Sequence, residues 1–250
     1  MNGVPAAVHA ALVDLDGTLL DTVPDIAAAV NRMLAALGLR ECSEHAVRNL
    51  VGQGSARLVE RCLALDGAAG RSFDRDPLEL FVRFYDEESG VRTRSFPGVI
   101  EGLGAIAAQG VRLACVTNKL TRFTVPLLER TGLAHFFAAV VCGDSVARLK
   151  PDPLPMLHAC RLLAVEPAEA IVIGDSANDV AAARAAGCRV LCVPYGYSEG
   201  QSVSSLGCDC VVDDLCGAAR FIAEQDAQGR AERRGTPGIT ADSRVKGTNP

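Results

Sequence analysis

The chain has 250 residues, of which 49% are hydrophobic and 22% are charged, and its formal net charge is −5. A chain of this length can bury one sizeable core together with a second, smaller subdomain. The acidic balance, with no run of lysines or arginines in the part expected to fold, gives no electrostatic reason to expect binding to nucleic acid or to an anionic membrane.

No apolar segment approaches the ~20 residues of a membrane span, and the first residues lack the basic start and apolar centre of a signal peptide. We therefore expect a cytoplasmic protein. The ten cysteines agree with a reducing compartment, because they are scattered through apolar segments without a C-x-x-C pair. Most of them are expected to be small buried hydrophobes.

The first expected element is an apolar run at residues 9–13, which has the length and composition of a buried strand. A helical pattern follows at residues 24–37, with Pro24 in its first turn and Gly38 just past its end. Further helical patterns cover residues 43–50, 55–65 and 77–88. Residues 25–88 contain no convincing strand pattern, so the first strand is followed by a helical block.

From residue 96 onward, apolar runs of strand length alternate with helical patterns. The strands are predicted at residues 111–116, 138–142, 170–173, 190–193 and 210–212, and the helices at residues 99–109, 121–131, 153–163, 179–186 and 215–224. Such alternation predicts a parallel sheet covered by helices on both faces. The predicted fold class is α/β, a Rossmann-like parallel-sheet core with the helical block inserted after its first strand.

This pattern divides the chain into a core at residues 1–21 and 93–225, an inserted helical cap at residues 22–92, and a tail at residues 226–250. The tail is rich in Gly, Thr, Pro, Ser and Arg. It cannot bury enough apolar surface to offset the entropy of ordering, so we expect it to be disordered. Its excess of basic residues leaves a docking role open, although a solvated appendage is the simpler interpretation.

Reactive side chains stand next to the ends of several predicted strands. They are Asp14 and Asp16 after the first strand, Thr117 and Asn118 after the second, Lys150 before the helix that follows the third, and Asp175, Ser176 and Asp179 after the fourth. Ligands of open α/β sheets bind at the carboxyl ends of the strands, so we expect these side chains to lie together. Simpler alternatives are a loop start at Asp14, helix caps at Thr117 and Asp175, and a surface cation at Lys150.

These residue types suit a phosphoryl group. Several carboxylates near an oxygen-rich turn are the ligands that Mg²⁺ prefers, and a magnesium ion together with a lysine can neutralise the charge of a phosphate. Threonine hydroxyls and backbone N–H groups near a helix start can hold the remaining phosphate oxygens. One aspartate can attack phosphorus to form an acyl phosphate, and a second aspartate can protonate the leaving oxygen.

Residues 9–224 resemble the haloacid dehalogenase superfamily, and within it the bacterial phosphoglycolate phosphatases. Four motifs carry the resemblance: Asp14-x-Asp16-Gly17-Thr18, Thr117-Asn118, Lys150-Pro151-Asp152-Pro153 and Gly174-Asp175-Ser176-x-x-Asp179. The resemblance implies a mobile cap, which corresponds to the helical block and closes over the site.

The resemblance also implies the role of each matching residue. Asp14 would be the nucleophile and a magnesium ligand, Asp16 the general acid/base and a further metal ligand through its backbone carbonyl, and Asp175 the third ligand. Thr117 would hydrogen-bond the phosphoryl group, and Lys150 would orient Asp14 and balance its charge. Thr18 and Asn118 are further candidates for binding the substrate. Asp179 would steer metal-bound water or Lys150 without binding the metal itself, and Ser176 would lie in the same outer layer.

Single residues separate the subclasses of this superfamily. The dehalogenases and the phosphonoacetaldehyde hydrolases lack an aspartate where this chain has Asp16, so its presence favours phosphate esters. Related sugar-phosphate mutases usually carry Glu where this chain has Gly174, so a phosphatase is favoured over a mutase. The segments around Thr117-Asn118-Lys119 and Tyr195-Gly196-Tyr197 resemble the phosphoglycolate enzymes in particular, whereas Leu120 departs from the proline that many of them have.

Substrate choice is less constrained by the motifs. The carboxylate of a small substrate needs a cation or an amide cradle, and the cap loop that holds Gly52, Gly54 and Arg57 is the candidate, since glycines permit close backbone approach. Arg57 could instead be a solvated helix residue, and Lys119 and Arg122 are rival cations.

We therefore expect a Mg²⁺-dependent phosphomonoesterase that hydrolyses 2-phosphoglycolate, as a monomer or a homodimer. Its partner would be a small phosphate ester, with no nucleic acid and no membrane. The alternatives are a sugar-phosphate or pyrophosphate phosphatase of the same superfamily, and a catalytically silent binding protein that kept this fold.

Overall fold

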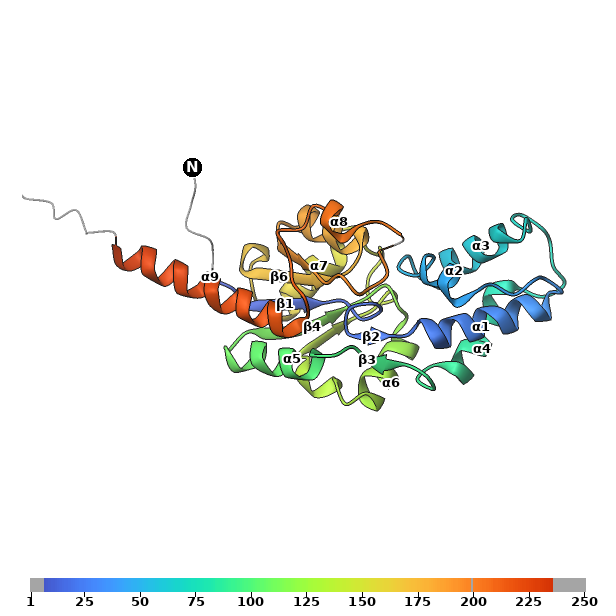
Figure 1. Cartoon of the computed structure of the whole chain (residues 1–250), viewed down its shortest axis with the longest axis horizontal. Helices are drawn as coiled ribbons and strands as arrows, with labels where there is room; N and C mark the ends of the chain where they lie inside the picture. The colour runs from blue at the N-terminus through green and yellow to red at the C-terminus, as the bar shows by residue number, and fades with distance from the viewer. Residues whose placement is uncertain (1–6, 199, 236–250) are drawn as a thin grey trace, which may run out of the picture.

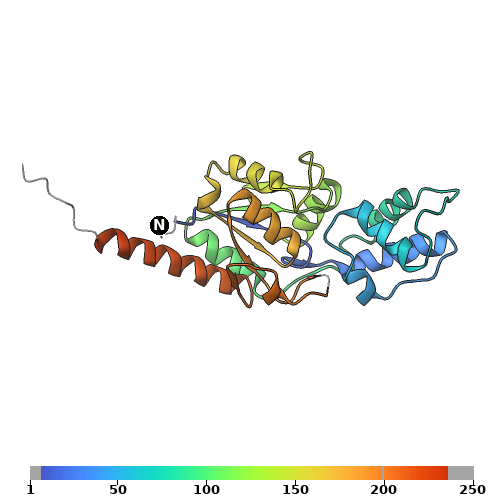
Figure 2. The ribbon, with the colours of Figure 1, turned by 90° about the horizontal axis from the view of Figure 1, so that it is seen from above.

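The computed structural model describes residues 7–198 and 200–235. These residues form a sheet-containing core and a block of four helices (Figure 1). The block lies at one end of the elongated molecule, and the last helix, α9 (Leu215–Gly235), extends from the other end (Figure 2). No helix among the described residues has both the length and the hydrophobicity of a membrane span.

The core is built on one sheet of six parallel strands. In spatial order these are β5 (Ala139–Val141), β4 (Arg112–Val116), β1 (Ala10–Val13), β6 (Ala170–Gly174), β7 (Arg189–Cys192) and β8 (Cys210–Val211). The chain builds outward from β1 in one direction and then, from β6 onward, in the other. The strand order therefore reverses beside β1, and in open α/β sheets such a reversal opens a crevice at the carboxyl ends of the strands.

The central strands are buried on both faces, which explains why they are continuous apolar runs rather than alternating ones. All four residues of β1 are fully buried. One face of the sheet packs against α5 (Val99–Ala108), α6 (Thr121–Arg130) and α9, and the other against α7 (Leu154–Leu162) and α8 (Ala177–Ala186). Val13 points to the first face and Leu12 to the second, as the two-residue period of a strand requires.

The helical block consists of α1 (Val23–Ala36), α2 (Glu44–Arg48), α3 (Ser55–Leu65) and α4 (Pro77–Glu88), which share a separate apolar cluster. Its two connections to the core form a short antiparallel ribbon, β2 (Leu20–Asp21) with β3 (Arg94–Ser95). Beside the ribbon, the buried carboxylate of Asp25 accepts hydrogen bonds from the backbone N–H groups of Gly90, Arg92 and Thr93. Asp25 therefore ties the first turn of the block to the segment that leads out of it.

The expected α/β class, the parallel sheet and the inserted helices are confirmed. Every predicted strand and helix is present, but the two-residue strands β2 and β3 were not predicted, since so short a pair has no periodic signal. The prediction of a disordered tail from residue 226 was wrong for residues 226–235, because α9 continues to Gly235. The rest of that predicted tail, residues 236–250, lies outside the described residues.

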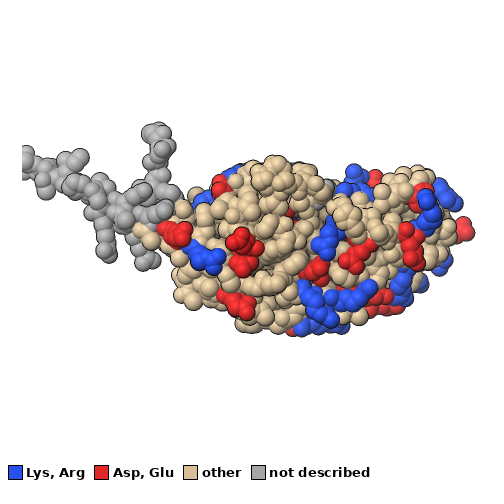
Figure 3. All heavy atoms as spheres, viewed as in Figure 1, with Lys and Arg blue, Asp and Glu red and all other residues tan. Residues whose placement is uncertain are grey.

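All ten cysteines are free thiols, and six of them are buried. Most therefore act as small apolar side chains, as expected. On the face drawn in Figure 3, acidic and basic side chains lie close to one another over the helical block, whereas the described part of the core carries few charges.

Candidate active site

The predicted reactive residues come together at the carboxyl edge of the sheet. Asp14 directly follows β1, Thr117 follows β4, and Asp175 follows β6. Because β4 and β6 flank β1, these three positions are neighbours beside the strand-order reversal. They line a pocket whose volume is about 630 Å³ when the open space at its mouth is included. The helical block covers this pocket from the opposite side. Residues far apart in the sequence thus meet in one cavity between the two parts of the molecule.

Lys150 is at the centre of the polar contacts in this pocket. Its buried ammonium group donates to Asp14 Oδ1 at 2.7 Å, to Asp179 Oδ1 at 2.7 Å and to the carbonyl oxygen of Val116 at 2.8 Å. Burial alone would lower the pKa of Lys150, but the charges of Asp14 and Asp179 outweigh it and raise that pKa. Lys150 is therefore a permanent cation whose three N–H donors are all used.

Asp179 lies next to the pocket lining and accepts more hydrogen bonds than Asp14, Asp16 or Asp175. Its side chain is fully buried. Its Oδ2 atom accepts from the hydroxyl of Ser176 at 2.6 Å and from the backbone N–H groups of Ser176 and Asp175 at 3.2 and 3.4 Å, and its Oδ1 atom faces Lys150. Both oxygens are therefore occupied, and Asp179 fixes the loop after β6.

Two loops hold the carboxylate of Asp175 in place, one that contains Thr18 and one that contains Tyr197. The hydroxyl of Thr18 donates to Oδ1 at 2.9 Å, and the backbone N–H of Tyr197 donates to Oδ2. Gly17 has φ +91°, and a side chain there would place its Cβ 2.3 Å from Asp175 Oδ2. Gly196 is equally close to the same carboxylate from the other side, with a Cβ 2.3 Å away. Glycine is therefore required at both positions for the loops to enclose Asp175.

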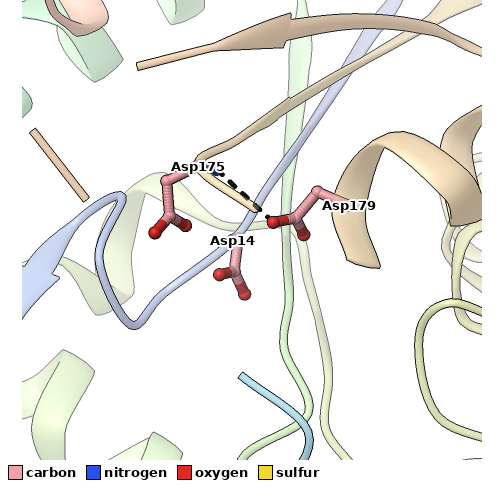
Figure 4. Close-up of side chains that lie close together, drawn as sticks. All are labelled: Asp14, Asp175 and Asp179. Atoms are coloured by element: carbon pink, nitrogen blue, oxygen red, sulfur yellow. Dashed lines mark hydrogen bonds between the residues drawn. The ribbon is translucent and has the colours of Figure 1, made fainter. Parts of the chain in front are cut away.

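Asp14, Asp175 and Asp179 form a compact acidic cluster (Figure 4), in which one oxygen of each lies within 4.8 Å of the others. Burial, opposed by Lys150, raises the pKa of Asp14 to about 7. Burial and the charges of Asp14 and Asp179 raise the pKa of Asp175 well above its usual value. Three buried carboxylates with a single contacting lysine leave an excess of negative charge, which a divalent cation would neutralise.

The donor set fits such a cation. Oδ2 of Asp14 accepts no hydrogen bond from any described residue, and each oxygen of Asp175 accepts only one. Asp14 and Asp175 can therefore offer carboxylate oxygens to a hard divalent ion, whereas both oxygens of Asp179 are occupied. The cluster contains Asp14 and Asp175 of the predicted metal ligands. The third predicted ligand, Asp16, is not among its carboxylates.

Asp16 instead turns its side chain away from the acidic cluster. Its carboxylate accepts two contacts from the ammonium of Lys119, at 3.0 and 2.9 Å, and one from the hydroxyl of Thr22 at 2.6 Å. Burial would lower the pKa of Lys119, but Asp16 and Tyr85 outweigh it and raise that pKa. Two acids two residues apart thus have different partners, because the chain leaves the strand and turns at Gly17.

A family model described as haloacid dehalogenase-like hydrolase matches residues 11–193. The chain is 47% identical over 220 residues to a phosphoglycolate phosphatase of Nitrosospira multiformis, covering 87% of this chain and 97% of that one. It is 48% identical over 206 residues to a plasmid-encoded phosphoglycolate phosphatase of Cupriavidus necator, covering 82% and 89%. This chain belongs to the haloacid dehalogenase-like hydrolase family.

Solved structures of the family share the arrangement. A crystal structure from Haemophilus somnus, described as a predicted phosphoglycolate phosphatase, superposes with a TM-score of 0.80 at 32% identity and covers 86% of this chain and 97% of its own. Membership of this family agrees with the α/β core and makes the chain a hydrolase. Phosphatases of this family generally use a divalent metal, in agreement with the acidic cluster.

In this haloacid dehalogenase-like hydrolase, most predicted site residues line the pocket. They are Asp14, Asp16, Gly52, Gly54, Thr117, Asn118, Lys150, Asp175 and Ser176. Thr18 and Asp179 do not line it; the hydroxyl of Thr18 donates to Asp175, and its substrate-binding role stays a prediction. The side chain of Asn118 is also occupied, since its Nδ2 donates to the carbonyl oxygens of Gly52 and Lys150, both at 2.9 Å. Asn118 therefore joins the core to the helical block.

Arg57 is not part of the pocket lining in this structure. Its guanidinium pairs with Glu60 on the outer side of α3, and both side chains are more than half exposed. This placement agrees with the alternative of a solvated helix residue, and a substrate-binding role for Arg57 stays a prediction. An arginine in an amphipathic helix gives no signal of which face it occupies until the helix packs.

Two residues that line the pocket received too little weight in the sequence analysis. Lys119 was named only as a rival cation, and Tyr85, in the helical block, was not singled out, although both line the pocket. Lys119 had a usable signal, because it follows Thr117-Asn118 at a strand end. Tyr85 had none, because an aromatic residue at helical spacing usually belongs to a core.

Proposed function

We propose that this chain is a Mg²⁺-dependent phosphomonoesterase that hydrolyses 2-phosphoglycolate to glycolate and phosphate. The observation that carries the proposal is the Asp14 carboxylate: one oxygen contacts Lys150 at 2.7 Å, and the other has no hydrogen bond from the described residues in a pocket that Asp175 also lines. The relatives from Nitrosospira multiformis and Cupriavidus necator carry the name of this activity.

Magnesium is the proposed ion because Asp14, Asp175 and the backbone carbonyl of Asp16 are all hard oxygen donors, and a small number of protein oxygens is what Mg²⁺ takes beside its retained waters. When bound, it would neutralise the transferring phosphoryl group and lower the repulsion between that group and the Asp14 carboxylate. Lys150 would supply the second positive charge and keep Asp14 ionised and oriented.

The reaction would proceed in two displacements. An oxygen of Asp14 attacks phosphorus while the bond from phosphorus to the glycolate oxygen breaks, and Asp16 gives its proton to that leaving oxygen. Asp16 then takes a proton from water as the water attacks the aspartyl phosphate, which releases phosphate and restores Asp14. The two acids have separate partners, Lys150 for Asp14 and Lys119 for Asp16, so their carboxylates lie in different surroundings, as two different roles require.

The decisive experiment is a panel of phosphomonoesters assayed with Mg²⁺ and with a chelator. We expect phosphate release from 2-phosphoglycolate that requires the metal, and a loss of at least ~10³-fold in kcat for Asp14→Asn. No release by the wild type, or undiminished release by Asp14→Asn, would support a catalytically silent protein. Equal or faster turnover of sugar phosphates or pyrophosphate would favour the alternative substrates.

Asp16→Asn is the matched control for the roles of the two acids. With an activated aryl phosphate, whose leaving group needs no proton, this variant should still form the aspartyl phosphate but release it slowly. Asp14→Asn should form none. Equal loss of intermediate formation in both variants, measured by trapping and mass spectrometry, would contradict the assignment.

We further propose that the enzyme works in the reducing cytoplasm as a monomer or a homodimer. The ten free cysteines support the compartment, because thiols of secreted proteins are usually paired. Size-exclusion chromatography with light scattering would determine the oligomeric state.

A further inference from the structure

Two lysines are the cations among the described residues that line the pocket, Lys119 and Lys150. Lys150 has no donor left, since its three N–H groups face Asp14, Asp179 and the carbonyl of Val116. Lys119 directs its ammonium at a single carboxylate, that of Asp16, and retains donor capacity toward the cavity. A substrate anion other than the phosphoryl group therefore has Lys119 as its available cation.

Tyr85 has an unpaired hydroxyl next to Lys119 in the pocket. Its side chain lines the pocket and is only 1% exposed, yet its hydroxyl makes no hydrogen bond of acceptable geometry with any described residue. Burial raises the pKa of Tyr85; contacts with Lys119 and Ser89 oppose that rise but give the hydroxyl no well-formed hydrogen bond. A buried hydroxyl without a partner costs free energy, so its presence beside a cavity points to a ligand that completes it.

The ring of Tyr85 is fixed by its neighbours. It stacks on Phe81 with 5.5 Å between ring centroids and meets Phe123 edge-on at 4.7 Å. The ammonium of Lys119 lies 4.9 Å from the centre of the same ring. The hydroxyl and the ammonium group are therefore held next to each other, one by the helical block and one by the core.

We propose that Lys119 and Tyr85 together bind the carboxylate of the substrate. This inference rests on the proposed function and deepens it, because it names the residues that select a short carboxylated phosphate ester. Since one donor comes from each part of the molecule, the carboxylate site is complete only when the helical block is seated on the core.

The contact between Lys119 and Asp16 sets the length of the substrate. Asp16 is the proposed proton donor to the leaving oxygen, and its carboxylate lies 2.9 Å from the ammonium of Lys119. The leaving oxygen and the recognised anion must therefore be close to each other. In 2-phosphoglycolate a single CH₂ group and the carboxyl carbon separate the leaving oxygen from the carboxylate oxygens. Sugar phosphates place no anion at that distance.

Other nearby arginines are already engaged elsewhere. Arg122 pairs with Asp86 and is about half exposed, and Arg57 pairs with Glu60; neither lines the pocket. The apolar residues that complete the wall, Ile26, Val51, Leu58 and Phe81, would fit the CH₂ group but offer nothing to a second charge.

The test compares 2-phosphoglycolate with its amide, which has the same size and no carboxylate charge. For the wild type, kcat/KM should favour the acid. Tyr85→Phe should lower that preference about tenfold and Lys119→Met more, mainly through KM for the acid, because each loses a hydrogen bond to a charged group. Arg57→Met is the control for loss of a nearby positive charge, and its preference should match the wild type.

The outcomes separate this inference from the proposed function. A wild type that hydrolyses the amide as well as the acid would overturn the proposed substrate. A wild type that prefers the acid, with the preference unchanged in both Tyr85→Phe and Lys119→Met, would overturn the carboxylate site alone. Tyr85→Phe removes a hydroxyl with no partner, so its thermal midpoint should not fall, and a lower preference cannot then be ascribed to misfolding.

Discussion

The two walls of the pocket differ in how completely their polar groups are paired. On the core side, all three N–H donors of Lys150 are used, both oxygens of the neighbouring Asp179 accept hydrogen bonds, and the loops around Asp175 are so tight that glycine is required. On the side of the helical block, the wall is mostly apolar, and its most buried polar group, the Tyr85 hydroxyl, has no partner among the described residues. The core side is thus built for fixed chemistry, and the block side is completed by what it binds.

We expect this difference to separate the residues of the proposed reaction from those of substrate recognition. A preorganised set of charges must be saturated with hydrogen bonds to hold its geometry, whereas a recognition surface must leave groups free. We expect this contrast to be energetic as well as geometric.

The largest effect on stability is expected from Lys150→Met. This change leaves Asp14 and Asp179 without their shared cation in a buried site, and breaking a buried ion pair costs about 3–5 kcal/mol. Urea unfolding in a chelator would measure the loss. Lys119→Met is the matched comparison at the other core lysine that lines the pocket. It faces one carboxylate instead of two, so the loss should be smaller. An equal loss would contradict the special place of Lys150 in the buried charge network.

Divalent metal should stabilise the core by a similar mechanism. In a chelator, the pKa of Asp14 is raised in the folded state from 3.8 to about 7, so the folded protein holds this proton more tightly than the unfolded chain does. Stability should therefore fall as pH rises from about 4 toward 7 and then level off.

Added Mg²⁺ should reverse that loss, by about 2.7 kcal/mol at a hundred times its dissociation constant. Thermal midpoints across this pH range, with and without Mg²⁺, would check both effects. Asp175→Asn is the control, since it removes a proposed ligand and a buried charge. The same Mg²⁺ shift in Asp175→Asn would contradict the assignment of this carboxylate to the metal.

Asp25→Asn tests the joint between the two parts. An amide would turn its own N–H donors toward the backbone N–H groups of Gly90 and Thr93, which now share one carboxylate oxygen. One or two buried donors would lose their acceptor, at about 1–3 kcal/mol each. Asp66→Asn, whose partner Arg40 is exposed, should cost less than ~1 kcal/mol. Unfolding curves would compare the two.

Tyr197→Phe should have the smallest effect. The Tyr197 hydroxyl donates to Asp21 at 2.6 Å and accepts from the backbone N–H of Thr22 at 2.8 Å, where the first linker enters α1. Its loss should cost about 1 kcal/mol. Tyr195→Phe, which loses one hydrogen bond to a carbonyl at 3.0 Å, is the matched control and should cost no more. A larger loss from Tyr195→Phe would show that the joint is not specially stabilised by Tyr197.

Sequence was sufficient for the core because its signals are local. Buried parallel strands are uninterrupted apolar runs, and the acids, the Thr117 motif and the lysine that carry the chemistry stand directly at their ends. The order of strands and the carboxyl-edge rule then bring Asp14, Thr117 and Asp175 together without further information. The continuation of α9 past residue 225 was missed because its composition is that of a solvated tail.

Only the tertiary structure decided how the pocket is divided between the two parts. The placement of Arg57 outside the pocket, the pairing of Asp16 with Lys119 and the unpaired hydroxyl of Tyr85 all depend on how the helical block packs against the core. Helical periodicity indicates that a face is buried but not what it faces, since the same apolar stripe can pack on its own subdomain or close a cavity. The residues of the proposed chemistry were therefore predictable from sequence, whereas the proposed basis of selectivity depends on packing.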